Sequence, residues 1–354
     1  MEEKKDTLGM LDLVIRPGFC VKENQIIKVN QAAGSLFITP GTDVRPLLLT
    51  GSEEYAAFTG GCLYLTLNLS SHSCGASVTR VDDIDVFLLE QESDNGELRS
   101  MALAARELRE PLTNVMITAD SLFPLCAAES SPRTAEQVAR LNRGLFQILR
   151  IIGNMSDAER CAAVSHQETV DIPALFAEFF EKAETLVSHT GITLTYEGPD
   201  QPIYGLADRE QLERAVLNIL SNAIKFTPKG GTVAAKLTRS GRMLRLSVTD
   251  SGSGIAQSVR SSVFSRYLRQ PALEDSRYGI GLGMVLIRTA AAHHGGAVLI
   301  DQPEGVGTRI TMTMSIRQSK QATLRPNVLR VDYAGERDHG LIELSECLPT
   351  ELYE

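Results

Sequence analysis

The sequence predicts a multidomain α+β protein, because three differently patterned segments follow one another along the chain. Residues 8–92 alternate apolar and polar side chains over short runs, as half-buried strands do. Residues 96–160 repeat apolar side chains every seven positions, as paired helices do. Residues 165–316 alternate amphipathic helices with strands, which is typical of a two-layer α/β sandwich. Residues 317–354 form a C-terminal extension with weaker patterning.

Composition limits the classes of protein. A chain of 354 residues is long enough for two or three domains, and a net charge of -9 disfavours general binding to nucleic acid or anionic lipid. No run approaches the roughly 20 apolar residues that a membrane span needs, and no secretion signal is recognisable. We therefore expect a cytoplasmic protein with no nucleic-acid partner and no membrane span. The 6 cysteines lack paired spacing, so reduced thiols are expected rather than a zinc site.

The first segment predicts a small sheet with short helices. "LDLVIRPGFCVKENQIIKVNQAAGSLF" gives two strands about a polar turn and a helix that begins near Asn30, and "CLYLTLNLS" and "GASVTRVDDIDVFLLEQE" give three more strands. This order of strands and helices resembles a PAS domain. In that family an Asn followed by two small residues often occupies the position at which this chain has Asn30-Gln-Ala-Ala. The resemblance implies a sensor domain; a general α+β interaction domain is the alternative.

The middle segment predicts a helical hairpin. The loop "FPLCAAESSP" separates its helices, and Ser131-Pro132 begins the second with a capping serine and a proline at the first helical position. The apolar seam of the first helix is Leu98, Ala105, Leu112 and Ala119 with Met101, Leu108, Val115 and Leu122, and that of the second is Val138, Leu145 and Ile152 with Leu141, Ile148 and Met155. A two-helix hairpin buries only one layer of side chains, so we expect a homodimeric four-helix bundle. The alternative is a hairpin that docks on its own neighbouring domains.

The third segment predicts alternating helices and strands. "DIPALFAEFFEKAETLVSHTG" reads as a helix with an aspartate cap and a glycine stop, "ITLTYEG" as a strand, and "DREQLERAVLNILSNAIKFTP" as a helix that ends before proline. "GTVAAKLTRSGRMLRLSVTDSGSGI" follows as a hairpin, and a last strand turns Ile310, Met312, Met314 and Ile316 to one side. In the extension, "VLRVDY" could add an edge strand and "LIELSECL" a short helix or strand, or a docking segment for another protein.

Three short motifs in this segment suit a nucleotide. Asn218 and Asn222 are four residues apart on one helix face, and amide oxygens suit a magnesium ion that phosphate and water already surround. In "DSGSGI" an aspartate after a strand can accept from an exocyclic amine, and its glycines permit a close turn. "YGIGLGM" opens a helix whose N–H groups suit phosphate. Each motif alone is weak, and no β-α-β unit supports a dinucleotide fold.

Taken in order, these motifs resemble the ATP-binding domain of histidine kinases. "NILSNAIKFTP", "DSGSGI", "VFSRYLR", "YGIGLG" and "EGVGT" stand in the places of that family's asparagine, glycine, phenylalanine, second glycine and closing boxes. The resemblance implies a Bergerat-type site for ATP and Mg²⁺, with Asn222 as the magnesium ligand and residues 257–278, including Phe264, Arg266 and Tyr267, as a lid. The ATP-binding residues that it implies are Asn218, Asn222, Lys225, Asp250, Gly252, Gly254, Ile255, Tyr267, Gly279, Gly281, Leu282, Gly283 and Thr308.

The helix before this domain departs from the family at one position. Where the family reads Ser-His-Glu-Leu-Arg-Thr-Pro-Leu, this chain reads Ala-Arg-Glu-Leu-Arg-Glu-Pro-Leu, so Arg106 stands in the place of the acceptor histidine. Arginine stays protonated and offers only donors, so it should not accept phosphate. Glu107, the expected catalytic base, has no imidazole to serve, and Glu110 could pair with Arg106 one turn away. None of the other histidines is expected to replace the acceptor.

These observations favour a homodimeric, ATP-binding member of the sensor histidine kinase family that works in two-component signalling without its own acceptor histidine. Its partner would be a response regulator or a complete histidine kinase. One alternative is an active kinase that phosphorylates a partner in trans. An ATPase of the same fold is less favoured, because Glu210 and Glu213 lie away from the position of the water-activating glutamate in those enzymes.

Overall fold

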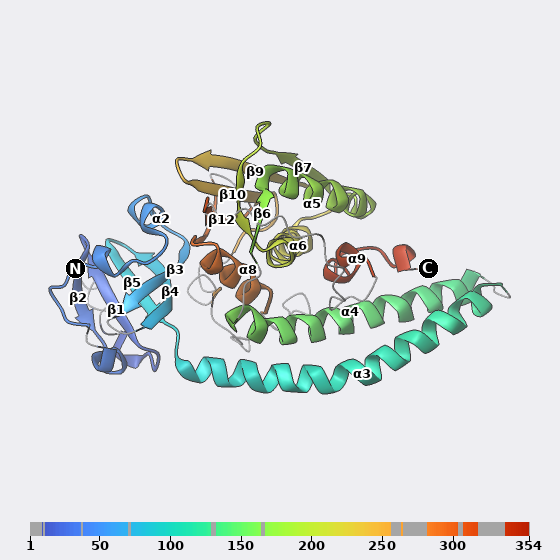
Figure 1. Ribbon diagram of the computed structural model, residues 1–354, viewed down its shortest axis with the longest axis horizontal. Coiled ribbons are helices and arrows are strands. Elements are labelled where there is room, and N and C mark those ends of the chain that lie inside the picture. Colours follow the sequence, from blue (N-terminus) through green and yellow to red (C-terminus); the bar gives the residue numbers. More distant parts are fainter. Residues whose placement is uncertain are drawn as a thin grey trace.

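The computed structural model describes most of the chain, and Figure 1 shows it from one side. The long helix α3 (Glu92–Ala128) runs along one edge and packs against α4 (Pro132–Ala163), the N-terminal strands lie at one end, and the nucleotide-motif segment lies above α4. The described residues are 9, 11–36, 38–69, 72–128, 132–163, 167–255, 263–264, 282–303, 307–317 and 337–353.

One ten-stranded sheet connects the N-terminal segment with the nucleotide-motif segment. Its order is β2-β1-β5-β4-β3-β11-β12-β10-β9-β7, and only β7 and β9 are parallel neighbours. The strands are β1 (Gly18–Lys22), β2 (Gln25–Val29), β3 (Cys62–Leu69), β4 (His72–Val81), β5 (Ile84–Leu89), β7 (Thr193–Glu197), β9 (Thr232–Ser240), β10 (Met243–Asp250), β11 (Val298–Asp301) and β12 (Arg309–Ser315). Neighbours β3 and β11 pair antiparallel, with Val298 opposite Tyr64 and Ile300 opposite Cys62. The sequence did not predict this junction, because strand periodicity does not say which edges meet.

The N-terminal strands form where alternation predicted them. The connecting helices are η1 (Leu11–Leu13), η2 (Ala32–Leu36), η3 (Arg45–Leu47) and α2 (Ser52–Ala56). Buried Asn30 holds the turn before η2: its Oδ1 accepts from the N–H groups of Gly18 and Ala33, both at 3.0 Å. Phe19 and Phe87 stack in the core with ring centroids 4.7 Å apart.

The helical hairpin forms as predicted, with one wrong boundary. Helix α4 begins at Pro132, as proline at a first helical position predicts. The expected break at "FPLCAAESSP" is wrong for its first six residues, because α3 continues through Pro124 to Ala128. Proline removes only one helical hydrogen bond there, and the neighbouring leucine and alanines favour helix. Among the described side chains of α3, five pack inward and are at most 8% exposed: Ala102, Ala105, Leu112, Met116 and Ala119.

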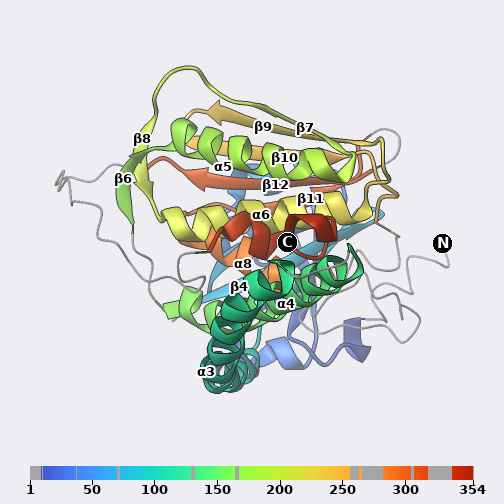
Figure 2. The same ribbon diagram turned by 90° about the vertical axis from the view of Figure 1, so that its right-hand side faces the viewer.

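Helices form the second layer on one face of strands β7, β9, β10, β12 and β11 (Figure 2). They are α5 (Ile172–Val187), extended by η4 (Ser188–Thr190), α6 (Arg209–Phe226) and α8 (Leu282–His293). Asp208 caps α6, since its Oδ1 accepts from the Gln211 N–H at 3.1 Å. The predicted aspartate cap of α5 is wrong: no side-chain cap bond forms, and Asp171 accepts instead from the Ile203 N–H at 3.2 Å. A small sheet of β6 (Glu168–Asp171) and β8 (Tyr204–Ala207) was not predicted.

The C-terminal extension returns to the hairpin. Helix α9 (His339–Glu343) and η5 (Thr350–Tyr353) lie between α6 and α4 (Figure 1), so part of "LIELSECL" is helical. The ring of Tyr353 lies 5.3 Å from that of Phe146 on α4. The possible edge strand "VLRVDY" lies outside the described residues. Within the ranges that the structure describes, no helix has the length and apolar character of a membrane span.

Candidate nucleotide-binding site

Helix α6 brings three of the predicted side chains to one site. Asn218 is 1% exposed and donates from Nδ2 to the Arg214 carbonyl at 2.9 Å. Asn222 follows one turn later and is half-buried, as is Lys225 in the last turn. The opposite face of α6 packs on the sheet through Val216, Ile219, Leu220 and Ala223, which are at most 3% exposed. The apolar face therefore fixes the direction in which the amides point.

Asp250 ends strand β10 and is held in one orientation. Its Oδ1 accepts from the N–H groups of Gly252 at 2.8 Å and Thr308 at 3.2 Å, and the residue is 7% exposed. Burial raises the pKa of this carboxyl group, against the two backbone hydrogen bonds, which lower it. Gly252 is required because a Cβ would overlap the carbonyl oxygen of Phe226 at the end of α6. Gly254 adopts a φ of 73°, a conformation that favours glycine.

The start of helix α8 meets the amide face of α6. Leu282 is the first helical residue and is buried, and a Cβ at Gly283 would lie 2.6 Å from Asn218 Oδ1. The unpaired N–H groups of α8 and the positive end of its dipole are thus near the amide of Asn218, an arrangement that suits phosphate oxygens. The predicted site residues Tyr267, Gly279 and Gly281 lie outside the described residues.

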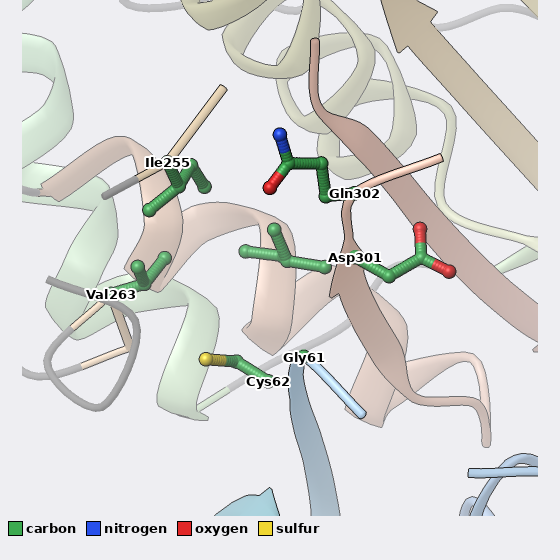
Figure 3. Close-up of a pocket in the computed structure, with 7 residues that line it drawn as sticks. Gly61, Cys62, Ile255, Val263, Asp301 and Gln302 are labelled. Atoms are coloured by element: carbon green, nitrogen blue, oxygen red, sulfur yellow. The ribbon is translucent and has the colours of Figure 1, made fainter. Parts of the chain in front are cut away.

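Ile255 reaches the junction between the two parts of the sheet instead of lying beside Asp250. It lines a cavity of about 10 Å³ with Gly61 and Cys62 of the β3 edge and with Val263, and Figure 3 shows these side chains around it. The remaining lining residues are Ile300, Asp301 and Gln302. Such a space is about large enough for one water molecule and not for a nucleotide base.

Two carboxylates that the sequence did not predict at this site lie on the same face of α6. Glu343 Oε2 is 3.3 Å from Asn218 Nδ2, and Glu346 Oε2 is 2.8 Å from Lys225 Nζ. Both glutamates belong to the C-terminal extension. The sequence signal was present in "IELSECL", where two acidic residues three apart alternate with apolar ones, but nothing in the pattern said what they would contact.

Two buried arginines balance these carboxylates. Arg150 of α4 lies 3.4 Å from Glu343 and 3.1 Å from Glu346, and Arg214 of α6 lies 3.1 Å from Glu343. Burial is the largest single influence on both groups and opposes their charged forms. Arg150 and Lys225 together still lower the pKa of Glu346, and Glu343 and Glu346 are the main partners that raise the pKa of Arg150. Arg214 also pairs with Asp157 of α4. This charge network joins α4, α6 and α9.

The altered acceptor position lies on the surface of α3. Arg106 and Glu107 are both exposed, as is Glu110, and no ion pair joins Arg106 to Glu110. The possible pair between them is therefore not formed. On α3, Arg109 donates to Ser156 of α4 at 3.3 Å, which helps to hold the hairpin.

The other histidines that lie within the described ranges have structural contacts or lie on the surface. His294 accepts at Nε2 from the Asp208 N–H at 3.0 Å and donates from Nδ1 to the Ala290 carbonyl at 2.7 Å. Burial lowers its pKa, so the ring is neutral at pH 7. The Nδ1 atom of His293 lies 3.2 Å from Gln211 Oε1, and His189 is exposed. His166 lies outside the described residues.

Comparison with known proteins defines the class of this domain. Residues 207–318 match the family model described as histidine kinase-, DNA gyrase B-, and HSP90-like ATPase. This segment contains the amide face of α6, Asp250 and the start of α8, so the site lies on an ATPase-like fold.

Longer similarities extend beyond that domain. The chain is 29% identical over 276 residues to an uncharacterized sensor-like histidine kinase of Rhizobium meliloti, covering 73% of this chain and 52% of the relative. It is 25% identical over 246 residues to the adaptive-response sensory kinase SasA of Crocosphaera subtropica, covering 66% of this chain and 64% of that one. The chain is thus similar to sensor histidine kinases over about two thirds to three quarters of its length. It spans about half to two thirds of the length of these relatives.

A solved structure has a similar fold. Full-length ShkA in complex with AMPPNP matches with a TM-score of 0.51 and 22% identity, over 70% of this chain and 54% of that one. At this identity the match concerns the fold alone: it supports the histidine-kinase ATPase-like arrangement of helices on a mixed sheet.

Proposed function

We propose that the chain binds ATP with Mg²⁺ at the site between α6, β10 and α8, and that it works in two-component signalling without phosphorylating itself at position 106. The observation that carries the proposal is the buried Asp250, whose Oδ1 is held by the N–H groups of Gly252 and Thr308. This carboxylate would accept from the exocyclic amine of adenine through Oδ2, and Gly252, at which a Cβ would overlap the Phe226 carbonyl oxygen, lets the turn after β10 pack closely on the end of α6.

The phosphate end of the site would lie along α6 and α8. Asn222 is the proposed ligand of Mg²⁺, and Asn218 and Lys225 would contact phosphate oxygens beside the α8 N-terminus. When bound, Mg²⁺ supplies positive charge that offsets that of the phosphates. Amide oxygens suit this ion because it keeps most of its phosphate and water ligands and needs few from the protein.

Arg106 is the basis for excluding self-phosphorylation. A phosphate acceptor must present a lone pair, and an exposed guanidinium stays protonated and offers only donors. Glu107 is present next to it but has no imidazole whose proton it could take. The proposed output is therefore protein binding, to a response regulator or to a complete histidine kinase, in the cytoplasm.

The proposed homodimer rests on exposed apolar side chains of the hairpin. In one predicted seam of α3, Leu108, Val115 and Leu122 are 50–53% exposed, although the fourth member, Met101, is partly buried and the companion seam packs on α4. On α4, Leu141 and Ile148 are 63% and 47% exposed. Exposed apolar side chains at heptad spacing on both helices fit a second hairpin, which would complete a four-helix bundle.

The N-terminal sheet is proposed as a PAS-like sensor. We assign it to residues 8–92, the hairpin to 96–160, the ATP-binding domain to 165–316 and the extension to 317–354. The pairing of β3 with β11 supports a sensor role, because a change in the N-terminal sheet would act directly on a strand of the ATP-binding domain.

A kinase that acts in trans is the second candidate, because it needs the same nucleotide site and no acceptor on this chain. An ATPase is less favoured. Glu213 lies away from the position of the water-activating glutamate in such enzymes, and it is 3.1 Å from His339 of the C-terminal extension.

Labelling with γ-phosphate-labelled ATP tests the proposal. The chain should bind the nucleotide and show no acid-labile phosphate on itself, whereas a radiolabelled chain with acid-labile phosphate would overturn the noncatalytic part. Adding a complete histidine kinase or a response regulator separates the alternative, since label on that partner alone would identify transfer in trans.

A further inference from the structure

The C-terminal segment, defined as residues 337–353, lies on the phosphate-binding face that the proposed function assigns to α6. Glu343 Oε2 accepts from Asn218 Nδ2 at 3.3 Å, and Glu346 Oε2 accepts from Lys225 Nζ at 2.8 Å. These two donors are the ones that the proposal gives to ATP. A carboxylate oxygen and a phosphate oxygen accept from amide and ammonium groups in the same way.

The segment is held at this place by packing as well as by charge. Four of its apolar side chains are at most 2% exposed: Ile342, Leu344, Leu348 and Tyr353. Arg143 of α4 donates to the carbonyls of Ser345 at 2.9 Å and Glu346 at 3.1 Å, and Asn142 donates to that of Tyr353 at 2.9 Å. Burial of this extent is typical of an ordered docking contact rather than of an incidental one.

The charges around Asn218 and Lys225 favour binding either the carboxylates of the segment or the phosphates of ATP, and not both at once. Glu343 is fully buried, and the cations near the two glutamates are Arg150, Arg214 and Lys225. With Asp157, which pairs with Arg214, three carboxylates balance these three positive charges. A triphosphate brought to Asn218 and Lys225 would face both carboxylates at close range in a partly buried environment, where repulsion between like charges is strong.

We propose that the C-terminal segment is an internal competitor of ATP, which closes the phosphate end of the site until nucleotide displaces it. The inference deepens the proposed function and rests on it. Displacement has a further consequence, because the segment also holds α4 through Arg143, Arg150 and Phe146. Nucleotide binding would therefore remove the contacts through which the segment links α4 to α6, leaving the direct contacts between the two helices, such as that of Arg150 with Ser221.

Fluorescence can report the displacement directly, because the chain contains no tryptophan. Leu352 is partly buried beside the apolar core, so Leu352→Trp places a single indole in the docked segment. Adding Mg²⁺ and ATP should shift its emission to longer wavelength as the segment leaves. An unchanged spectrum at ATP concentrations that saturate the site by calorimetry would overturn the proposal, since nucleotide and segment would then bind together.

Affinity measurements on full-length variants give an independent test. Glu346→Gln weakens the contact with Lys225, and Tyr353→Ala removes the anchor on Phe146 without touching the nucleotide site. Each should tighten binding of ATP with Mg²⁺, Tyr353→Ala by about tenfold, which corresponds to roughly 1.4 kcal/mol of lost competition. The matched control is Glu351→Gln, an exposed carboxylate of the same segment, which should leave affinity unchanged.

The outcomes separate this inference from the proposed function. Unchanged or weaker binding in both variants, with binding retained by the unmodified chain, overturns the competitor and leaves the nucleotide site standing. Weaker Mg²⁺-dependent ATP binding in Glu346→Gln alone would also overturn the competitor proposal, because Glu346 would then contribute to ATP binding instead of opposing it. If neither the unmodified chain nor the folded variants bind ATP, the proposed function fails. Circular dichroism of each variant shows whether it is folded.

Discussion

Arg288 Nη2 lies 2.5 Å from Glu90 Oε1, and this ion pair joins helix α8 to the end of the N-terminal sheet. The Arg288 side chain is 4% exposed, its Cζ lies 4.9 Å from the ring centre of Tyr64, and it donates to the Phe264 carbonyl at 3.1 Å. Tyr64 in turn donates to Glu90 Oε2 at 3.1 Å. One buried guanidinium therefore connects the β3 edge with the helix that begins at the nucleotide site.

Removing the charge of Glu90 should weaken the contact between helix α8 and the N-terminal strands and so destabilise the chain. We expect Glu90→Gln to lower the free energy of unfolding by about 2 kcal/mol, because a buried arginine loses its anionic partner. Urea unfolding measures the change. The control is Glu197→Gln, which breaks an exposed pair with Lys236 and should cost under about 0.5 kcal/mol. Equal, small effects would contradict a structural role for the Glu90 pair.

Asp250→Asn should weaken ATP binding by about tenfold or more without unfolding the chain. The substituted amide can keep its oxygen toward Gly252 and Thr308, but it would then present N–H donors where the adenine amine needs an acceptor. Calorimetry gives the affinity and circular dichroism the fold. Asp200→Asn, at an exposed carboxylate, is the control. If Asp250→Asn binds ATP with unchanged affinity, the adenine base does not bind at Asp250.

Arg106→His should create a phosphate acceptor beside Glu107. The unmodified chain should take up no acid-labile label from γ-labelled ATP, and the variant should acquire it, because the imidazole supplies a lone pair and Glu107 can take its proton. Arg106→Gln, which also removes the charge but gives no acceptor, should remain unlabelled. Label on the Gln variant would place the acceptor at another residue.

Leu108→Glu and Val115→Glu, combined, should convert a dimer into a monomer. Both side chains are about half exposed in the single chain and lie on the face proposed for the second hairpin, where buried carboxylates would be costly. Light scattering after size-exclusion chromatography gives the mass. Leu103→Glu tests an equally apolar residue on the opposite side of α3, 61% exposed, and should remain dimeric. If the unmodified chain runs as a monomer, the bundle proposal is wrong.

Stability should fall below pH 6.5 because of His294. Burial lowers its folded pKa below the ordinary 6.5, against smaller opposing effects of the Ala290 carbonyl and Asp208. The unfolded chain therefore binds a proton first, so the contribution is intact above pH 6.5 and is lost as the pH falls, at up to about 1.4 kcal/mol per pH unit. Denaturant midpoints from pH 7.5 to 5.5 measure this. His294→Gln should flatten the slope, whereas His189→Gln at an exposed position should not.

Local patterns predicted most elements of the fold, and the side chains of the proposed nucleotide site were chosen from the same patterns. The alternation in "CLYLTLNLS", the proline at position 132 and the amphipathic face of α6 each reflect contacts within one element, so the sequence alone is informative. The glycine at 252 was predicted for the same reason: a close turn after a strand needs a residue without Cβ.

Contacts between distant elements were not predictable in this way. The pairing of β3 with β11 depends on two edges that are more than 200 residues apart, and no local period encodes it. The placement of Glu343 and Glu346 on α6 depends on buried arginines from two other helices. Helix α3 extends into the predicted loop "FPLCAAESSP", since the one hydrogen bond missing at Pro124 does not end a helix of 37 residues.

Calorimetric titration of the full-length chain with ATP in the presence of Mg²⁺ tests the central claim most directly. We expect one site per chain with an affinity in the micromolar range, on the order of 8 kcal/mol of binding free energy or less, and a clear loss of binding in Asp250→Asn. The absence of binding heat, both in the unmodified chain and in folded Glu346→Gln and Tyr353→Ala variants, would contradict it.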